Sequence, residues 1–129
     1  MKKHTIHTDN APAAIGPYSQ AVGTDHLLFT AGQIPLSPQD GALVGDTIEA
    51  QTKQVLDNLK AVIEAGGSTL NNVLKTTVFL TDLNNFTKVN TLYSEYFGDA
   101  KPARSTIQVA ALPMGALVEI EAIAQRGCS

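Results

Sequence analysis

Arg104 stands at the start of a predicted strand, and Glu119 and Glu121 lie within the strand that follows it in the sequence. An arginine side chain presents a planar fork of donors that matches a carboxylate or a phosphate. A glutamate held near the bound anion can orient or deprotonate a water molecule. These three residues therefore predict hydrolytic chemistry on a small substrate that carries a carboxylate.

The same residues also allow a purely structural interpretation. If the strand that begins at Arg104 pairs with the following strand in a hairpin, Arg104 forms a cross-strand ion pair with Glu119 or Glu121. Such a pair contributes only about 0.2–1 kcal/mol to stability. Two glutamates against one arginine leave one carboxylate without a partner, which favours the catalytic hypothesis, but both interpretations stay open at this point.

The elements that must position these residues are predicted from apolar periodicity and from turn residues. Strands are expected at 4–7, 18–22, 26–32, 73–80, 104–110 and 117–125, helices at 46–65 and 84–97, and a long loop at 33–45. The first helix has Asp46 and Glu49 at the spacing of a capping box, and Gly66 follows its last turn. The strand at 26–32 is almost wholly apolar, which predicts burial on both of its faces.

The order βββαβαββ predicts a single α+β domain over residues 1–129, with a mixed sheet and both helices on one face. Strand alternation places Arg104 on one face with Glu119 and Glu121, whereas Ile107 is expected to face the helices. Two helices can cover one sheet face only, and the other face carries both polar and apolar side chains. An uncovered face of this kind predicts association with further copies of the chain.

Composition limits the classes of partner. The formal net charge is −3 and the basic residues are scattered, which argues against a nucleic-acid-binding protein. The single cysteine, Cys128, is next to the last residue and cannot form an internal disulfide, which is typical of a reducing compartment. The first residues lack the apolar core of a signal peptide, and no run is long enough to span a membrane. We therefore expect a cytoplasmic protein.

Known cofactor and metal motifs do not fit this sequence. His4 and His7 are three residues apart, which places them on opposite faces of a strand and makes them a poor metal pair. The run 66–68 lacks the lysine and spacing of a phosphate-binding loop. No serine lies in a Gly-x-Ser-x-Gly nucleophile motif. The predicted chemistry therefore uses neither a metal nor a cofactor.

Three more residues are candidates for a binding site. Tyr18 follows the rigid pair Gly16-Pro17 and carries a hydroxyl group, although a core or interface tyrosine is the commoner role. Asn90 lies at the edge of the apolar stripe predicted for the second helix, where most asparagines are merely solvated. Gly32 closes a strand, a position typical of a bulge or of a close approach to the backbone.

At these residues the sequence resembles the RidA (YjgF/UK114) family, the reactive intermediate or imine deaminases. The resemblance runs from about residue 5 to residue 126. It is carried by the segments 10–21, 31–35, 54–59, 75–80, 102–105 (PARS) and 119–124 (EIEAIA). Several motifs in the same order make the resemblance specific to the family, although some branches of the family lack the deaminase residues.

The resemblance implies a chorismate-mutase-like fold and a homotrimer with three clefts between subunits. It also implies a 2-iminobutanoate/2-iminopropanoate deaminase, which hydrolyses imines derived from enamines such as 2-aminoacrylate to 2-keto acids and ammonia. Arg104 matches the family's carboxylate-binding arginine, and Glu119 matches the glutamate that positions the attacking water. Tyr18, Gly32 and Asn90 match cleft residues.

Two positions of the cleft depart from well-known members of the family. This chain has Ala31 in place of a serine and Thr106 in place of a cysteine. The favoured mechanism uses neither group, so these changes bear on substrate preference. Two alternatives remain open: a non-catalytic trimer that binds a small metabolite or regulates a partner, and an RNA-cleaving translation inhibitor.

Overall fold

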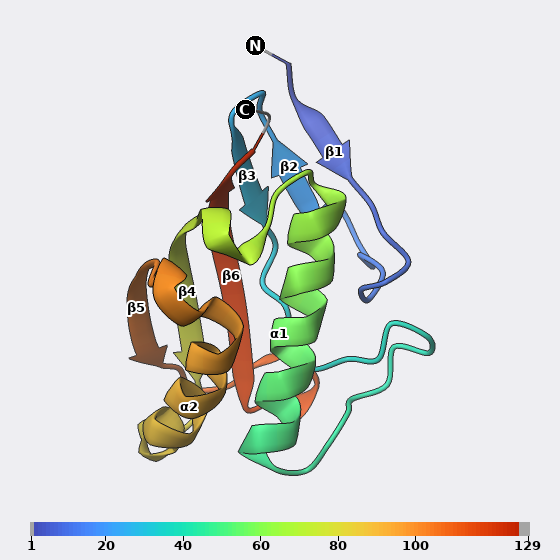
Figure 1. The fold of residues 1–129 in the computed structure, drawn as a ribbon. Helices are drawn as coiled ribbons and strands as arrows, with labels where there is room; N and C mark the ends of the chain where they lie inside the picture. Colours follow the sequence, from blue (N-terminus) through green and yellow to red (C-terminus); the bar gives the residue numbers. More distant parts are fainter. Residues whose placement is uncertain (1, 127–129) are drawn as a thin grey trace.

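The described chain, residues 2–126 of a computed structural model, contains one six-stranded mixed sheet (Figure 1). The strands are β1 (His4–Ile6), β2 (Ala21–Gly23), β3 (Leu27–Thr30), β4 (Val73–Leu80), β5 (Ala103–Gln108) and β6 (Val118–Gln125). Their order across the sheet is β1-β2-β3-β6-β4-β5. Neighbours pair antiparallel except β4 and β5, which run parallel.

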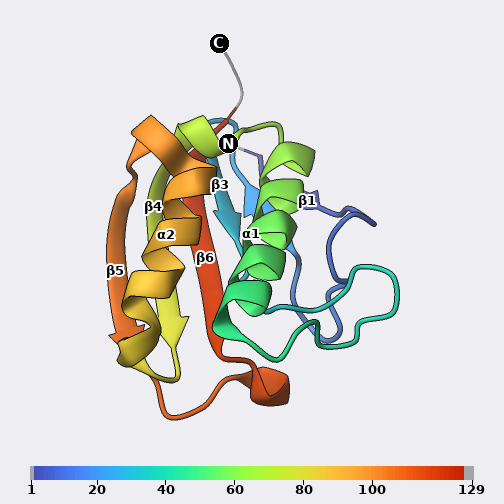
Figure 2. The same ribbon diagram turned by 60° about the horizontal axis from the view of Figure 1, so that its bottom comes forward.

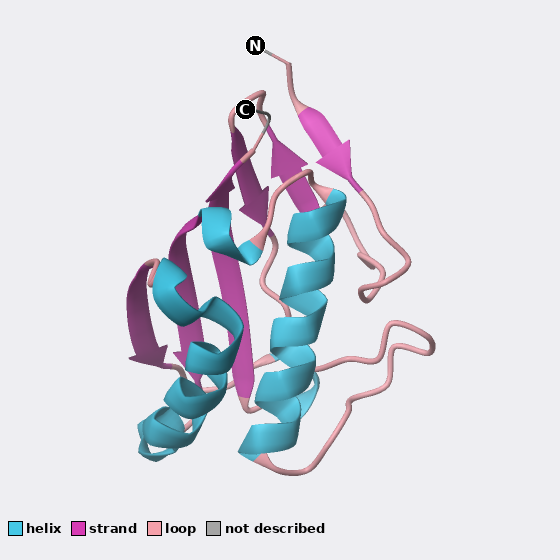
Figure 3. Ribbon diagram, in the orientation of Figure 1, coloured by secondary structure: helices cyan, strands magenta, loops and turns pink. Residues whose placement is uncertain are grey.

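Two α-helices of the described chain, α1 (Ile48–Ala65) and α2 (Phe86–Phe97), lie side by side over one face of this sheet (Figures 1 and 2). Short 3-10 turns join the elements at Leu70–Asn72, Leu83–Asn85, Gly98–Ala100 and Pro113–Gly115. Figure 3 shows the resulting helix layer against the strands, with the long loop between β3 and α1 beside them. The predicted α+β class, mixed sheet and one-sided helix layer are confirmed.

The core lies between the helices and the sheet. Along α1, the stripe of Val55, Leu59 and Val62 is fully buried, and it faces a sheet surface that includes Leu28 and Ile120. Each such side chain contributes about 1.5–3 kcal/mol through burial. The stripe recurs at helical spacing, which is why the sequence predicts this helix well.

The start of α1 differs from the predicted capping box. The N-cap is Thr47, whose Oγ1 accepts a hydrogen bond from the backbone N–H of Ala50 at 3.1 Å. Asp46 therefore lies one residue outside the helix. Threonine and aspartate are both good N-cap residues, so when they are adjacent the local sequence does not decide between them. The predicted end of the helix at Gly66 is confirmed.

The predicted hairpin between the last two strands is wrong. β5 pairs with β4 in parallel register, with Arg104 opposite Thr76 and Ile107 opposite Phe79. β6 pairs with β4 on the other side, with Glu119 opposite Phe79. The segment between β5 and β6 is long enough to cross the end of β4, so neighbours in sequence are not neighbours in the sheet. The expected ion pair across a hairpin is therefore excluded.

The faces predicted for β5 are also reversed. Arg104 and Thr106 point toward α2, whereas Ile107 lies on the open face and is 45 % exposed. The prediction assumed that apolar side chains of β5 face the helices. This assumption fails because the open face also carries large apolar side chains, including Phe29, which is 43 % exposed. The apolar sequence of β3 predicted burial on both faces. This prediction is wrong for the same reason, because one face of β3 lies on the open side of the sheet.

Some sequence features lie outside this arrangement. Tyr18 precedes β2 instead of lying in it, and its N–H donates to the carbonyl oxygen of Gly16 at 2.9 Å across a tight turn at Pro17. Within residues 2–126, no helix is long and apolar enough to cross a membrane. Cys128 lies outside the described residues.

Candidate active site

The stripe of α2 that faces β5 consists of Phe86, Asn90 and Tyr93, spaced i, i+4 and i+7. Arg104 lies against this stripe. Its Nη1 donates a hydrogen bond to Asn90 Oδ1 at 2.8 Å. Its guanidinium carbon lies 4.8 Å from the ring centre of Tyr93 and 5.2 Å from that of Phe86. One amide and two aromatic rings therefore hold the guanidinium group.

Among residues 2–126, no carboxylate lies close enough to Arg104 to neutralise its positive charge. In the described part of the chain, no Asp or Glu oxygen lies within 4.0 Å of its nitrogens. Asn90 occupies one of the five N–H donors, which leaves donors for another ligand. An arginine in this condition is suited to bind an anion, and a planar carboxylate can accept two of its hydrogen bonds.

A hollow of about 450 Å³ opens beside this arginine. We call it the arginine half-site, and it is lined by Asn90, Tyr93, Ser94, Phe97, Gly98, Lys101, Pro102 and Arg104. Its lining holds two cations, Arg104 and Lys101, and no acidic residue. The arginine half-site can therefore attract and hold an anion but has no carboxylate that could act as a base.

Glu119 lies on the opposite face of the sheet, beside Gly32. A methyl group at Gly32 would overlap Glu119 Oε2, so the carboxylate fills the space that a side chain at position 32 would occupy. The backbone of Gln33 pairs with Ile120, N–H to O at 2.8 and 3.1 Å, and fixes Gly32 next to the strand. Burial, and to a smaller extent the charge of Glu121, raises the pKa of Glu119.

The hollow around Glu119, about 480 Å³, is the glutamate half-site. It is lined by Pro12, Ala13, Ala14, Tyr18, Gln20, Ala31, Gly32, Gln33, Ile34, Leu36, Pro113 and Glu119. This lining contains one carboxylate and no lysine or arginine. The glutamate half-site can therefore handle a proton but has no cation with which to hold an acidic substrate.

Buried amide side chains fix the loops of the glutamate half-site. Asn58 of α1 donates to the carbonyl oxygens of Ile34 and Leu36 at 3.1 and 2.9 Å. Gln20 donates to the carbonyl oxygen of Pro12 at 2.8 Å and accepts from the N–H of Thr8 at 2.7 Å. A buried amide that loses such partners costs about 1–3 kcal/mol, so these contacts hold the irregular backbone in place.

The predicted site residues thus separate into two groups. Asn90 and Arg104 lie in the arginine half-site, whereas Tyr18, Ala31, Gly32 and Glu119 lie in the glutamate half-site. Thr106 is half-buried on the same face of β5 as Arg104 but lines neither hollow. Within one chain the structure does not bring the two predicted catalytic residues together.

Sequence reasoning missed the aromatic rings that hold Arg104. The sequence predicts an apolar stripe on this helix but does not show that two of its rings, Phe86 and the buried Tyr93, contact Arg104. Their spacing on either side of Asn90 indicates only that the three side chains face one direction, because positions i, i+4 and i+7 do so.

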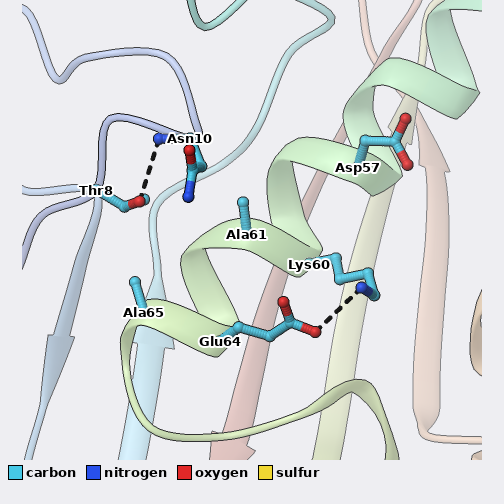
Figure 4. Close-up of a pocket in the computed structure, with 7 residues that line it drawn as sticks. All are labelled: Thr8, Asn10, Asp57, Lys60, Ala61, Glu64 and Ala65. Carbon is cyan, nitrogen blue, oxygen red and sulfur yellow. Dashed lines mark hydrogen bonds and ion pairs between the residues drawn. The ribbon is translucent and has the colours of Figure 1, made fainter.

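A third hollow lies between α1 and the loop that follows β1 (Figure 4). It is lined by Thr8, Asn10, Asp57, Lys60, Ala61, Glu64 and Ala65. Lys60 Nζ lies 3.1 Å from Glu64 Oε2, and Asp57 contacts both Lys53 and the hydroxyl group of Tyr96. Because these charged groups already have partners, this hollow is a weaker candidate than the two half-sites.

The fold and the two half-sites define a small α+β protein equipped to bind an anion and, separately, to handle a proton. Residues 8–126 match the family model described as Endoribonuclease L-PSP. The chain therefore belongs to this family, which is also known as the YjgF/UK114 or RutC family and includes the Rid proteins. The family resemblance of the sequence is confirmed.

Individual relatives are similar over almost the whole chain. A RutC family protein of Pyrococcus horikoshii is 53 % identical over 124 residues, which cover 96 % of this chain and 98 % of that protein. The mouse protein named 2-iminobutanoate/2-iminopropanoate deaminase is 50 % identical over 97 % of this chain and 93 % of its own length. The crystal structure of a Rid family protein from Yersinia pestis superposes with a TM-score of 0.93 at 52 % identity, covering 96 % of this chain and 99 % of that one.

Proposed function

We propose that this protein is a 2-iminobutanoate/2-iminopropanoate deaminase, which hydrolyses small 2-imino acids to 2-keto acids and ammonia without a cofactor. The observation that carries this proposal is the arginine half-site: Arg104 is held by uncharged groups and keeps free donors for a substrate carboxylate. The name of the mouse relative, at 50 % identity, supports the same reaction.

In the proposed reaction, Arg104 binds the substrate carboxylate and places the C=N carbon beside a water molecule held by Glu119. The water oxygen adds to the carbon of the protonated imine while Glu119 accepts a proton. Glu119 passes that proton to the nitrogen of the tetrahedral intermediate and then accepts the proton of the hydroxyl group as the C–N bond breaks, so that ammonia leaves and the C=O bond forms. Burial raises the pKa of Glu119 above its ordinary value, which makes the carboxylate a better base than an exposed glutamate.

Because Arg104 and Glu119 occupy opposite faces of one chain, we propose that the site is completed between copies in a homotrimer. The arginine half-site of one copy would face the glutamate half-site of the next, so that each contributes what the other lacks. The open face of the sheet supports this assembly, since it exposes the large apolar side chains Phe29 and Ile107.

The test is release of pyruvate from 2-aminoacrylate generated by a dehydratase. We expect the wild type to accelerate release over buffer, and Arg104→Ala and Glu119→Gln each to lower kcat/KM by about 100-fold or more. Lys60→Ala and Glu95→Gln are matched controls, since both side chains lie on helix surfaces outside the half-sites. A wild type that gives no acceleration would refute the proposed function. Binding of 2-ketobutanoate without turnover would indicate a metabolite-binding protein, and RNA cleavage lost in Arg104→Ala would indicate a nuclease.

A further inference from the structure

Of the side chains that hold Arg104, Tyr93 is the most tightly held, because both its ring and its hydroxyl group have contacts of their own. The side chain is 7 % exposed, whereas Phe86 is 36 % exposed. Its ring packs against Phe97, with 4.5 Å between ring centres. Its hydroxyl group shares a 2.6 Å hydrogen bond with Oγ1 of Thr76, which is fully buried. The ring cannot turn without breaking this bond or opening the core.

Thr76 connects this ring to the strand that carries the arginine. In the parallel pairing of β4 with β5, Thr76 lies directly opposite Arg104. The hydroxyl of Tyr93 is thus attached to the strand next to Arg104, and its ring face lies 4.8 Å from the guanidinium carbon. Tyr93 on α2, Thr76 on β4 and Arg104 on β5 therefore contact one another in series. Because the ring of Tyr93 is fixed, it fixes the orientation of Arg104.

The choice of an aromatic ring has a chemical consequence. A carboxylate could also hold the guanidinium group, but it would neutralise the charge and compete with an acidic ligand for the same N–H donors. A ring face attracts the cation through its quadrupole and uses none of those donors. The contact with Tyr93 therefore orients Arg104 and leaves its charge and its donors available.

We propose that Tyr93, anchored by Thr76, is a positioning residue that orients Arg104 to receive the carboxylate of the substrate. The identity of the ligand rests on the proposed function, whereas the orientation of Arg104 does not. Loss of the ring is therefore expected to weaken substrate binding, and loss of the hydroxyl group alone to have a smaller effect.

The first measurement needs no catalytic activity. In the ¹⁵N–¹H NMR spectrum of the folded protein, the Nε–H proton of Arg104 is expected to be shifted upfield by the ring faces beside it, relative to that of Arg126. The shift should persist in Tyr93→Phe and decrease in Tyr93→Leu or in the milder Tyr93→Met. A wild-type Arg104 resonance at the ordinary position would overturn the inference even if no variant folded.

The second measurement is steady-state imine hydrolysis with the same variants, together with Thr76→Val and the double variant Tyr93→Phe/Thr76→Val. We expect Tyr93→Leu to raise KM and the Kd for 2-ketobutanoate about tenfold, with kcat changed less than about twofold. Tyr93→Phe should recover most of the affinity, and the double variant should be no weaker than Tyr93→Phe. An unchanged KM in a folded Tyr93→Leu protein would overturn the positioning role.

The two measurements separate this inference from the proposed function. If the wild type neither hydrolyses imines nor binds 2-ketobutanoate, the proposed function fails, and the resonance of Arg104 alone decides whether Tyr93 orients it. If the wild type is active but Tyr93→Leu loses kcat and melting temperature together with no change in KM, Tyr93 is merely structural and the inference fails.

Discussion

Arg104 and Glu119 lie on opposite faces of the same sheet, on strands that flank β4. Arg104 is opposite Thr76 of β4 and points toward α2, whereas Glu119 is opposite Phe79 of β4 and points to the open face. The sheet itself separates the group that can bind an anion from the group that can accept a proton. A reaction that uses both groups at once therefore requires a second copy of the chain.

The contact between Gly32 and Glu119 leads to the first prediction. A methyl group at position 32 would overlap the carboxylate of Glu119, so Gly32→Ala should displace this group by about 1 Å and lower kcat about 100-fold. The backbone of Gly32 is not in the left-handed region, so alanine is expected to be tolerated by the fold. Imine hydrolysis and thermal unfolding, measured on the same preparation, check both statements.

The double variant Gly32→Ala/Glu119→Asp is the control for this prediction. Aspartate is shorter by one methylene group and leaves room for the added methyl group, so the double variant should lose less activity than the two single losses combined. Wild-type kcat in Gly32→Ala would show that the placement of the Glu119 carboxylate beside Gly32 does not matter for catalysis.

Periodicity and composition predicted individual helices and strands well, whereas they did not predict how the strands pair or which way their side chains face. Helix α1 has a strong apolar periodicity and strand β4 is rich in β-branched residues, so the boundaries of both elements were predicted to within two residues. The pairing of β5 could not be predicted, because the sequence does not reveal whether a loop turns back or crosses a neighbouring strand. The faces of β5 were inverted at Ile107, because a large apolar side chain can also lie on the open face of the sheet, where Ile107 is exposed.

The pKa of Glu119 gives the second prediction. Burial raises this pKa above the ordinary value of 4.5, and the nearby charge of Glu121 raises it further. Since the mechanism uses the ionised carboxylate, activity should rise with pH through a midpoint above 4.5. Glu121→Gln should move this midpoint down. An upward movement, or none, would contradict the electrostatic role assigned to Glu121.

The same shift predicts a pH-dependent stability, the third prediction. The folded chain holds the Glu119 proton more tightly than the unfolded chain, so this group stabilises the fold fully below its unfolded pKa. That contribution is lost as the pH rises through the folded pKa. Glu119→Gln removes the ionisation and should therefore be more stable than the wild type at pH 7, with a smaller difference at pH 4. Urea unfolding at both pH values checks this, and a difference that grows toward low pH would contradict it.

The N-cap of α1 gives the fourth prediction. Thr47 accepts a hydrogen bond from the N–H of Ala50, whereas Asp46 lies outside the helix. Thr47→Ala should therefore cost about 1 kcal/mol in the free energy of unfolding, and Asp46→Ala much less. Urea titration of the two variants compares them directly. The reverse order would restore the capping box that the sequence predicted.

The candidate site was predictable as a set of residues but not as an arrangement. Arg104 and Glu119 attract attention because an arginine and a glutamate combine anion binding with proton transfer. Their separation depends on the register of β4 with both neighbours, which no local pattern encodes. The contact of Phe86 and Tyr93 with Arg104 could not be predicted, because a ring that packs against a cation has the same helical spacing as a ring that packs against leucine.

The activity of mixed oligomers tests the central claim most directly. Arg104→Ala and Glu119→Gln subunits are each expected to be nearly inactive alone. If sites form between copies of a trimer, refolding the two together in equal amounts should give about a quarter of the wild-type activity, because each mixed trimer then holds one intact pair. Activity no higher than that of the separate variants, in preparations shown by mass spectrometry to contain mixed oligomers, would contradict a site shared between subunits.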